Sequence, residues 1–280
     1  MTERREVLRS DSDPTSYQLR LFELEDRAGE AAHAQPGYEQ ANRAADESVT
    51  ATLDRGPLHP EEPSIERSSQ DASARFEVVR GACLQCGACS LVKTRTQVVF
   101  GDGNPRSPMA IVGEGPGEQE DATGKPFVGR SGALLEQALR ENQMLRKHVY
   151  ITNVLKCRAC ARDGDRLRNR PPEPIEVDAC RPWLVAELEI VSPLVILCLG
   201  GPAASWIIHP DFRITRERGQ WFPSRWAPAA IASFHPSYVL RQQGKAFNNA
   251  RDLLVQDIAS ARQKVIELRR SAATPSSQLR

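Results

Sequence analysis

The amino-acid sequence predicts an α/β fold with three layers (α/β/α), in which helices cover both faces of a mostly parallel, four-stranded central sheet. Two observations support this prediction. From about residue 76, short apolar runs of strand length alternate with segments whose apolar residues recur at helical spacing. Such alternation is typical of parallel sheets, because a parallel connection has to cross over the sheet and a helix usually makes the crossing.

The four expected strands are apolar runs, at residues 109–112, 149–154, 194–199 and 229–234. The first ends in a glycine-rich turn, the third in a glycine pair, and the fourth in His235-Pro236. In open parallel sheets, ligands bind at the carboxyl ends of the strands. Three of the four ends carry chemically useful side chains, Glu114, Asn153 and His235, so we expect the site there.

Four helices are expected between and after these strands. They are predicted from apolar residues three or four positions apart, at 132–143, 174–191, 202–208 and 246–270. Residues 76–270 are therefore interpreted as one domain, and residues 271–280 as a disordered tail. No internal repeat is visible.

Residues 1–75 are interpreted as a disordered, acidic extension, with at most a short helix at 19–24. They are rich in turn-forming residues and contain 9 Lys/Arg and 16 Asp/Glu, a net charge of −7. Residues 76–280 carry 28 basic and 20 acidic residues, a net charge of +8. A basic domain suits a partner with a phosphate backbone, although simple solubility accounts for the same charge.

The composition indicates a globular protein of the cytoplasm. No run approaches the roughly 20 apolar residues of a membrane span, and the first residues lack the order of a signal peptide. In that compartment the 7 cysteines are expected to be thiols or metal ligands rather than disulfides.

The strongest local signal follows the first strand, in the segments 113–121 and 124–130. Its glycines allow close approach of the backbone to a ligand, its acidic residues could orient a water, and the ring of Phe127 could face a flat ligand. A surface turn with a solvated acidic run explains the same pattern. No Gly-Lys-Ser/Thr follows, so a Walker-type nucleotide loop is not indicated.

Five motifs together resemble the family 4 uracil-DNA glycosylases, and they occur in the family's order. They are Thr-Arg-Thr-Gln-Val-Val-Phe-Gly at 94–101, Gly-Glu-Gly-Pro-Gly at 113–117, Gly-Lys-Pro-Phe-Val-Gly at 124–129, Asn-Val-Leu-Lys-Cys-Arg at 153–158, and His-Pro-Ser-Tyr at 235–238. Each motif alone is modest, but the ordered set is specific. The resemblance covers roughly residues 83–257.

The resemblance implies a role for each matching pocket residue. Asn153 would read the Watson–Crick edge of uracil, Phe127 would stack on the pyrimidine, and His235 would stabilise the uracil anion as the glycosidic bond breaks. Glu114 and the backbone of Gly115 would shape the pocket. An amide suits this task because it both donates and accepts hydrogen bonds, and the target base has to leave the stack to reach the pocket.

The residue that activates water is open. Better-known uracil glycosylases carry an aspartate in the first motif, and this sequence has none there. Glu114, Glu120 or Asp121 could take its place, with Glu114 and Glu120 preferred as catalytic residues. Alternatively, stabilisation of the leaving group supplies most of the rate.

The segment after His235 is expected to contact DNA through Ser237, Leu240 and Arg241. In the family, the corresponding loop enters the helix where the base has left, and an apolar wedge beside an arginine suits that task. The alternative is the first turn of a helix with Leu240 in the core.

Four cysteines match the family's cluster ligands: Cys86, Cys89, Cys157 and Cys180. Four thiolates suit a [4Fe–4S] cluster or zinc, and the resemblance favours the cluster. It would fasten the amino-terminal segment and the 157–180 loop to the domain. Cys83 and Cys160 are alternative ligands, whereas Cys198 lies in an apolar strand and is expected to be a buried hydrophobic residue.

The sequence departs from the family pattern in an insertion at residues 159–172. Four arginines make the insertion basic, so it either contacts phosphates beside the pocket or forms a solvated loop. A related branch carries a histidine here that bonds covalently to the abasic sugar. This insertion contains no histidine, so we expect turnover.

The resemblance thus implies a base-excision repair enzyme that hydrolyses the N-glycosidic bond of uracil in single- or double-stranded DNA and leaves an abasic site. We expect a monomer, associated with the nucleoid if its source is prokaryotic. Two alternatives remain: a DNA-trapping or non-catalytic relative on the same fold, and a zinc-stapled nucleotide-binding or interaction protein.

Overall fold

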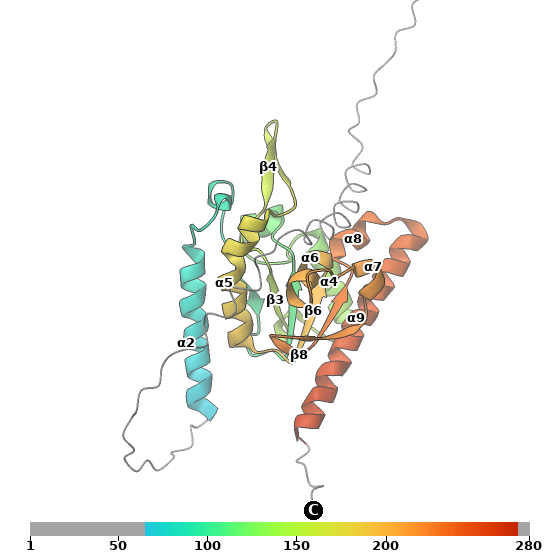
Figure 1. Ribbon diagram of the computed structural model, residues 1–280. Coiled ribbons are helices and arrows are strands. Elements are labelled where there is room, and N and C mark those ends of the chain that lie inside the picture. The colour runs from blue at the N-terminus through green and yellow to red at the C-terminus, as the bar shows by residue number, and fades with distance from the viewer. Residues whose placement is uncertain (1–64, 274–280) are drawn as a thin grey trace, which may run out of the picture. The chain divides into compact units, whose positions relative to one another are not determined.

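The computed structural model describes residues 65–273 (Figure 1). The expectations for 1–64 and 274–280, including the short helix at 19–24, lie outside the described residues. Helix α2 (Ile65–Leu84) begins eleven residues before the expected start of the domain at residue 76, so residues 65–75 are helical and not disordered as expected. The last helix continues to Ala273 and likewise passes the expected end at 270.

A six-stranded sheet with the order β1-β3-β2-β6-β8-β7 forms the centre of the domain. Its four inner strands are parallel to one another and confirm the predicted parallel sheet: β2 (Met109–Gly113), β3 (Tyr150–Asn153), β6 (Val195–Leu199) and β8 (Ala227–Ser233). Two antiparallel edge strands were not predicted, β1 (Asp102–Gly103) and β7 (Trp221–Ser224). One has only two residues and the other is half exposed, so neither produces an apolar run.

Helices cover both faces of this sheet, because successive strand residues point to opposite sides. On one face, Met109 and Ile111 pack with α4 (Arg130–Glu141), α8 (Pro236–Arg241) and α9 (Gly244–Ala273). On the other face, Ala110 and Val112 pack with α5 (Pro174–Val191) and α6 (Gly201–Ile207). The three-layer α/β/α prediction is therefore confirmed. Every residue of β2, β3 and β6 is buried, as expected for strands covered on both faces.

The remaining elements are short. They are η2 (Ser90–Lys93), α3 (Glu118–Thr123), η3 (Arg146–His148) and α7 (Ile214–Glu217). The insertion at 159–172 forms an exposed two-stranded hairpin, β4 (Cys160–Asp163) and β5 (Arg166–Asn169), which extends away from the sheet (Figure 1). Within residues 65–273, no helix combines the length and apolar character needed to cross a membrane.

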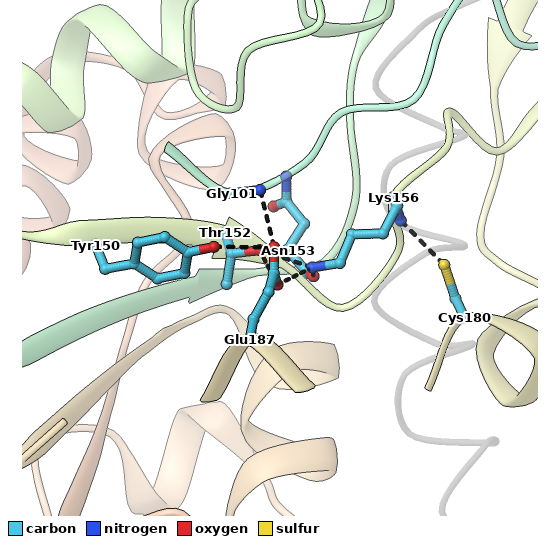
Figure 2. Close-up of polar contacts among 7 residues, drawn as sticks. All are labelled: Gly101, Tyr150, Thr152, Asn153, Lys156, Cys180 and Glu187. Carbon is cyan, nitrogen blue, oxygen red and sulfur yellow. Dashed lines mark hydrogen bonds and ion pairs between the residues drawn. The ribbon is translucent and has the colours of Figure 1, made fainter. Parts of the chain in front are cut away.

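A buried ion pair between Lys156 and Glu187 connects three parts of the chain (Figure 2). Both side chains are essentially inaccessible to solvent. The Glu187 carboxylate also accepts hydrogen bonds from the Tyr150 hydroxyl (3.0 Å), the Thr152 hydroxyl (2.8 Å) and the Gly101 amide (2.9 Å). Burial, followed by the neighbouring Glu187, holds the pKa of Tyr150 well above its usual value. The pair thereby fixes α5 to β3 and to the segment that precedes β1.

We expect Glu187→Ala to lower the free energy of unfolding by about 3–5 kcal/mol, because the Lys156 ammonium would stay buried without its partner. Urea denaturation followed by circular dichroism measures the change. The matched control is Glu136→Ala, which removes an exposed pair with Arg140 and should cost less than about 1 kcal/mol. Similar small losses in both variants would contradict a buried pair that organises the fold.

Candidate active site at the carboxyl end of the sheet

The carboxyl ends of β2, β3 and β8 bring the predicted pocket residues together. Gly113 and Asn153 are register partners at the ends of two adjacent parallel strands. A Cβ atom at Gly113 would lie 2.4 Å from Asn153 Oδ1 and 2.6 Å from the Phe127 ring. The rings of Phe127 and His235 are 5.6 Å apart between centroids. Gly113 therefore makes room for the site, a role that the sequence pattern alone did not identify.

Asn153 carries an unpaired acceptor into this site. The residue is 2% exposed, and its Oδ1 is buried with no hydrogen-bond partner in the described part of the chain. Its backbone carbonyl accepts a hydrogen bond of 2.7 Å from Lys156 Nζ, which holds the end of β3 in place (Figure 2). A buried acceptor without a donor is costly, so Oδ1 is a ready partner for an N–H group of a ligand.

Phe127 is held in an unusual backbone conformation. Its φ is +52°, in the left-handed region where a non-glycine residue costs about 1–3 kcal/mol. Gly132 permits this conformation, because a Cβ there would lie 2.0 Å from the Phe127 carbonyl oxygen. The ring of Phe127 is buried beside Gly113 and His235, so the strained backbone holds the ring at a fixed place in the site.

His235 lies two residues beyond the end of β8 and caps α8. Its Nδ1 accepts a hydrogen bond of 3.1 Å from the Ser237 amide and lies 2.7 Å from Ser237 Oγ. Because a backbone amide can only donate, the ring proton belongs on Nε2. Burial, together with the nearby Arg241 cation, lowers the pKa of His235 to about 4. The imidazole is therefore neutral at pH 7 and presents one N–H donor.

The acidic residues of the first motif differ in what they contact. Glu120 is buried, and its carboxylate accepts hydrogen bonds from the amides of Gly117 (3.1 Å), Val128 (2.9 Å) and Gly129 (2.9 Å). Asp121 accepts two hydrogen bonds, of 2.9 and 3.0 Å, from the Thr96 amide. Both carboxylates thus hold backbone segments together. Glu114 lies half buried directly after β2.

The rim residues Gly115, Ser237, Leu240 and Arg241 lie near this end of the sheet. Gly115 has room for a side chain, with the nearest atom 3.4 Å from a Cβ position, so its role rests on its backbone. The other three lie on α8, where Leu240 is half buried against the core and Arg241 donates to Ser237 Oγ at 3.3 Å. The wedge role of Leu240 stays a prediction.

The four predicted cluster ligands come from three segments of the chain. Cys86 and Cys89 lie between α2 and η2, and Cys89 is the N-cap of η2. Cys157 follows β3, and Cys180 lies in α5. Three N–H groups donate to their sulfur atoms: Trp183 Nε1 to Cys86 (3.3 Å), Arg95 to Cys157 (3.2 Å) and the Lys156 amide to Cys180 (3.2 Å).

This donor set fits a thiolate-bound iron–sulfur group, since such groups are held by cysteines and tuned by N–H donors to sulfur. Burial raises the pKa of Cys157 and raises that of Cys180 to about 11, so a metal would have to replace a proton at these thiols. Over residues 65–273, no three Cys, His, Asp or Glu side chains are gathered closely enough to hold a single metal ion.

The three remaining cysteines are all buried. Cys83 packs in an apolar cluster with Phe76 and Tyr150, and burial raises its pKa. Cys198 is fully buried within β6, as expected of a hydrophobic position, and burial raises its pKa as well. Cys160 starts the inserted hairpin.

Comparison with known proteins identifies the family. The model of the "Uracil DNA glycosylase superfamily" matches residues 100–259. A type-4 uracil-DNA glycosylase of Thermotoga maritima is 43% identical over 190 residues, which span 67% of this chain and 93% of the relative. Those of Archaeoglobus fulgidus and Sulfurisphaera tokodaii are 42% and 35% identical, over 56% and 70% of this chain and 79% and 87% of their own lengths. The chain therefore belongs to the uracil DNA glycosylase superfamily, among the type-4 uracil-DNA glycosylases.

Proposed function

We propose that this protein excises uracil from DNA by hydrolysing the N-glycosidic bond, and that it releases free uracil and leaves an abasic site. The observation that supports this most directly is the unpaired Oδ1 of Asn153, buried beside the Phe127 ring and the neutral His235. A planar base bound there would have the Phe127 ring against one face, the Asn153 amide at its Watson–Crick edge and the His235 N–H at one oxygen.

Asn153 distinguishes uracil from cytosine by the direction of its hydrogen bonds. Uracil presents an N3–H donor, which Oδ1 accepts, and an O4 acceptor, to which the amide NH₂ donates. Cytosine presents an acceptor at N3 and a donor at position 4, the reverse pattern. A cytosine in this pocket would leave the amide unpaired in a buried site, and sites of this kind discriminate strongly.

His235 stabilises the charge that develops on the leaving base. As the glycosidic bond breaks, negative charge spreads to O2 of uracil, where the Nε2–H of the neutral imidazole donates a hydrogen bond. Such a preorganised donor is worth more here than in water, because it is already oriented when charge appears. Ser237 maintains this tautomer through its amide.

The acidic residues divide into two roles. We assign Glu120 and Asp121 to holding the pocket loops, since their carboxylates accept backbone hydrogen bonds. Glu114, at the end of β2, is the remaining acidic candidate for orienting the water. Stabilisation of the leaving group by His235 supplies the rest of the acceleration.

The DNA approaches from the side of α8, with single- and double-stranded DNA both accepted and the enzyme acting as a monomer. Ser237 and Arg241 would contact phosphates and Leu240 the gap left by the base, which has to leave the stack. The inserted hairpin contains no histidine in this chain, which favours turnover over covalent trapping.

We further propose that Cys86, Cys89, Cys157 and Cys180 hold a [4Fe–4S] cluster. The cluster would have a structural role, because thiolate–iron bonds would cross-link the segments that follow α2 and β3 to α5. The N–H donors on three of the sulfurs support this ligand set.

Asn153→Ala should lower the single-turnover rate of uracil release by about 10²–10³-fold, because one oriented partner of the base is lost. A labelled oligonucleotide with one uracil, followed by alkaline cleavage of the abasic site, measures the rate. Gln137→Ala, an exposed amide on α4, is the matched control and should leave the rate unchanged. Equal rates for both variants and wild type would exclude Asn153 from recognition.

His235 should remain neutral well below the pH at which an ordinary histidine becomes charged. Its folded pKa of about 4 lies below the usual 6.5, so the ring gains a proton only as the pH falls through about 4. NMR of ¹⁵N-histidine-labelled protein should show an Nε2–H tautomer for His235 at pH 6. A resonance that titrates near pH 6.5 and is lost in His235→Gln would contradict this assignment.

Cys157→Ser should abolish the broad absorbance near 400 nm that a thiolate-bound iron–sulfur cluster would give, whereas Cys160→Ser should retain it. The two residues lie three positions apart and both are buried, so the pair controls for general loss of packing. Absorbance and iron content of the two purified variants show which of the two cysteines is a ligand. Loss of iron in Cys160→Ser but not in Cys157→Ser would transfer the ligand role to Cys160.

A further inference from the structure

Two side chains of opposite charge hold the loop that carries Phe127. On one side, the Glu120 carboxylate accepts hydrogen bonds from the amides of Val128 and Gly129. On the other side, the Arg146 guanidinium donates to the carbonyl oxygens of Pro126 and Phe127. Glu120 lies in the segment 113–121 that begins with the glycine-rich motif, whereas Arg146 lies outside every motif identified in the sequence.

We infer that Arg146 is a positioning residue of the uracil pocket, which acts by holding Phe127 in the conformation that places its ring beside the base. This inference rests on the proposed function, because it assigns the purpose of the ring to stacking on uracil. Arg146 contacts the backbone on both sides of Phe127, so its effect on uracil has to pass through that residue.

The geometry of these contacts explains how a single side chain can fix a backbone conformation. The Pro126 carbonyl belongs to the peptide group before the Phe127 α carbon, and the Phe127 carbonyl belongs to the group after it. Nη2 binds the first and Nη1 binds the second at 3.1 Å. Since φ and ψ are the rotations of these two peptide planes about one α carbon, a donor that orients both planes restrains both angles.

Such a restraint is needed because the conformation is unfavourable in itself. Phe127 has a φ of +52°, where an L-residue with a bulky side chain rarely remains without external support. Released from it, the residue would relax toward negative φ, which would redirect its side chain. The ring lies where a Cβ on Gly113 would be only 2.6 Å away, so even a small reorientation changes the shape of the pocket.

Arg146 is itself fixed to the sheet. It begins η3, directly before β3, and its Nε donates to Asp102 Oδ2 at 2.9 Å. Asp102 lies in β1, whose register pairs it with Ile151 of β3. One planar guanidinium thus makes three contacts in different directions, with Asp102 and with two carbonyl oxygens. A lysine has a single ammonium and cannot reproduce this arrangement.

A double-mutant cycle between Arg146 and Phe127 tests the inference. The variants are Arg146→Met, Phe127→Ala and the double variant in the full-length protein with its cluster. Arg140→Met, an exposed arginine on α4, serves as the control. The readouts are the inhibition constant of free uracil, the single-turnover release rate, and the affinity for DNA that already contains an abasic site.

We expect Arg146→Met to weaken the binding of free uracil about tenfold and to slow release by at least as much, while affinity for abasic-site DNA, which has no base to stack, changes less than about twofold. In the Phe127→Ala background, Arg146→Met should have almost no further effect on uracil binding, because its target is gone. Arg146→Lys should recover only part of the loss.

Three results would overturn the inference: wild-type uracil binding in folded Arg146→Met, an undiminished effect of Arg146→Met in the Phe127→Ala background, or an equal loss of affinity for abasic-site DNA. Absorbance near 400 nm and thermal unfolding identify the folded fraction of each variant. If Arg146→Met does not fold, the cycle is run with Arg146→Lys. Wild-type protein that releases no uracil would instead contradict the proposed function, so the two failures are distinguishable.

Discussion

The buried pair of Lys156 and Glu187 is the interaction on which the rest of the structure depends. Two opposite charges removed from solvent are stable only when each is fully coordinated. Here the Glu187 carboxylate accepts hydrogen bonds from Tyr150, Thr152 and the Gly101 amide in addition to its ion pair with Lys156. The same lysine holds the Asn153 carbonyl with its side chain and donates its backbone amide to Cys180. One residue therefore connects the sheet, the amide proposed to read uracil and the proposed cluster ligands (Figure 2).

Polar side chains around the pocket likewise have hydrogen-bond partners within the protein. Carboxylates of Glu120 and Asp121 hold backbone amides, and Arg146 holds backbone carbonyls, so the loops around the candidate pocket are held by contacts within the protein. Against this background of satisfied groups, Asn153 Oδ1 stands out because its hydrogen bond is missing. A rigid pocket with one unpaired acceptor recognises its ligand by completing the network, and little ordering entropy is lost on binding.

Sequence alone predicted the parallel core strands, four of the helices and the meeting of Asn153, Phe127 and His235, because apolar runs and strand-end residues leave clear patterns. It did not predict α2, whose first eleven residues it assigned to a disordered extension. It missed β1 and β7, which are too short or too exposed to form such patterns. It also missed Gly113 and Arg146. Their roles arise from contacts with Asn153 and Phe127, which are distant in sequence, and only the folded chain reveals them. Glu120 was expected to be a catalytic residue in place of the missing aspartate, but its carboxylate accepts hydrogen bonds from backbone amides.

The most direct test of uracil recognition compares two oligonucleotides that differ only at one position, uracil or cytosine, incubated with purified, folded protein and then treated with hot alkali. Cleavage at uracil is expected, with free uracil detected by mass spectrometry, and the cytosine strand should stay intact, since the Asn153 amide can pair with only one of the two base edges. No cleavage at uracil by folded protein, or equal cleavage of both strands, would contradict the proposal that this pocket reads and releases uracil.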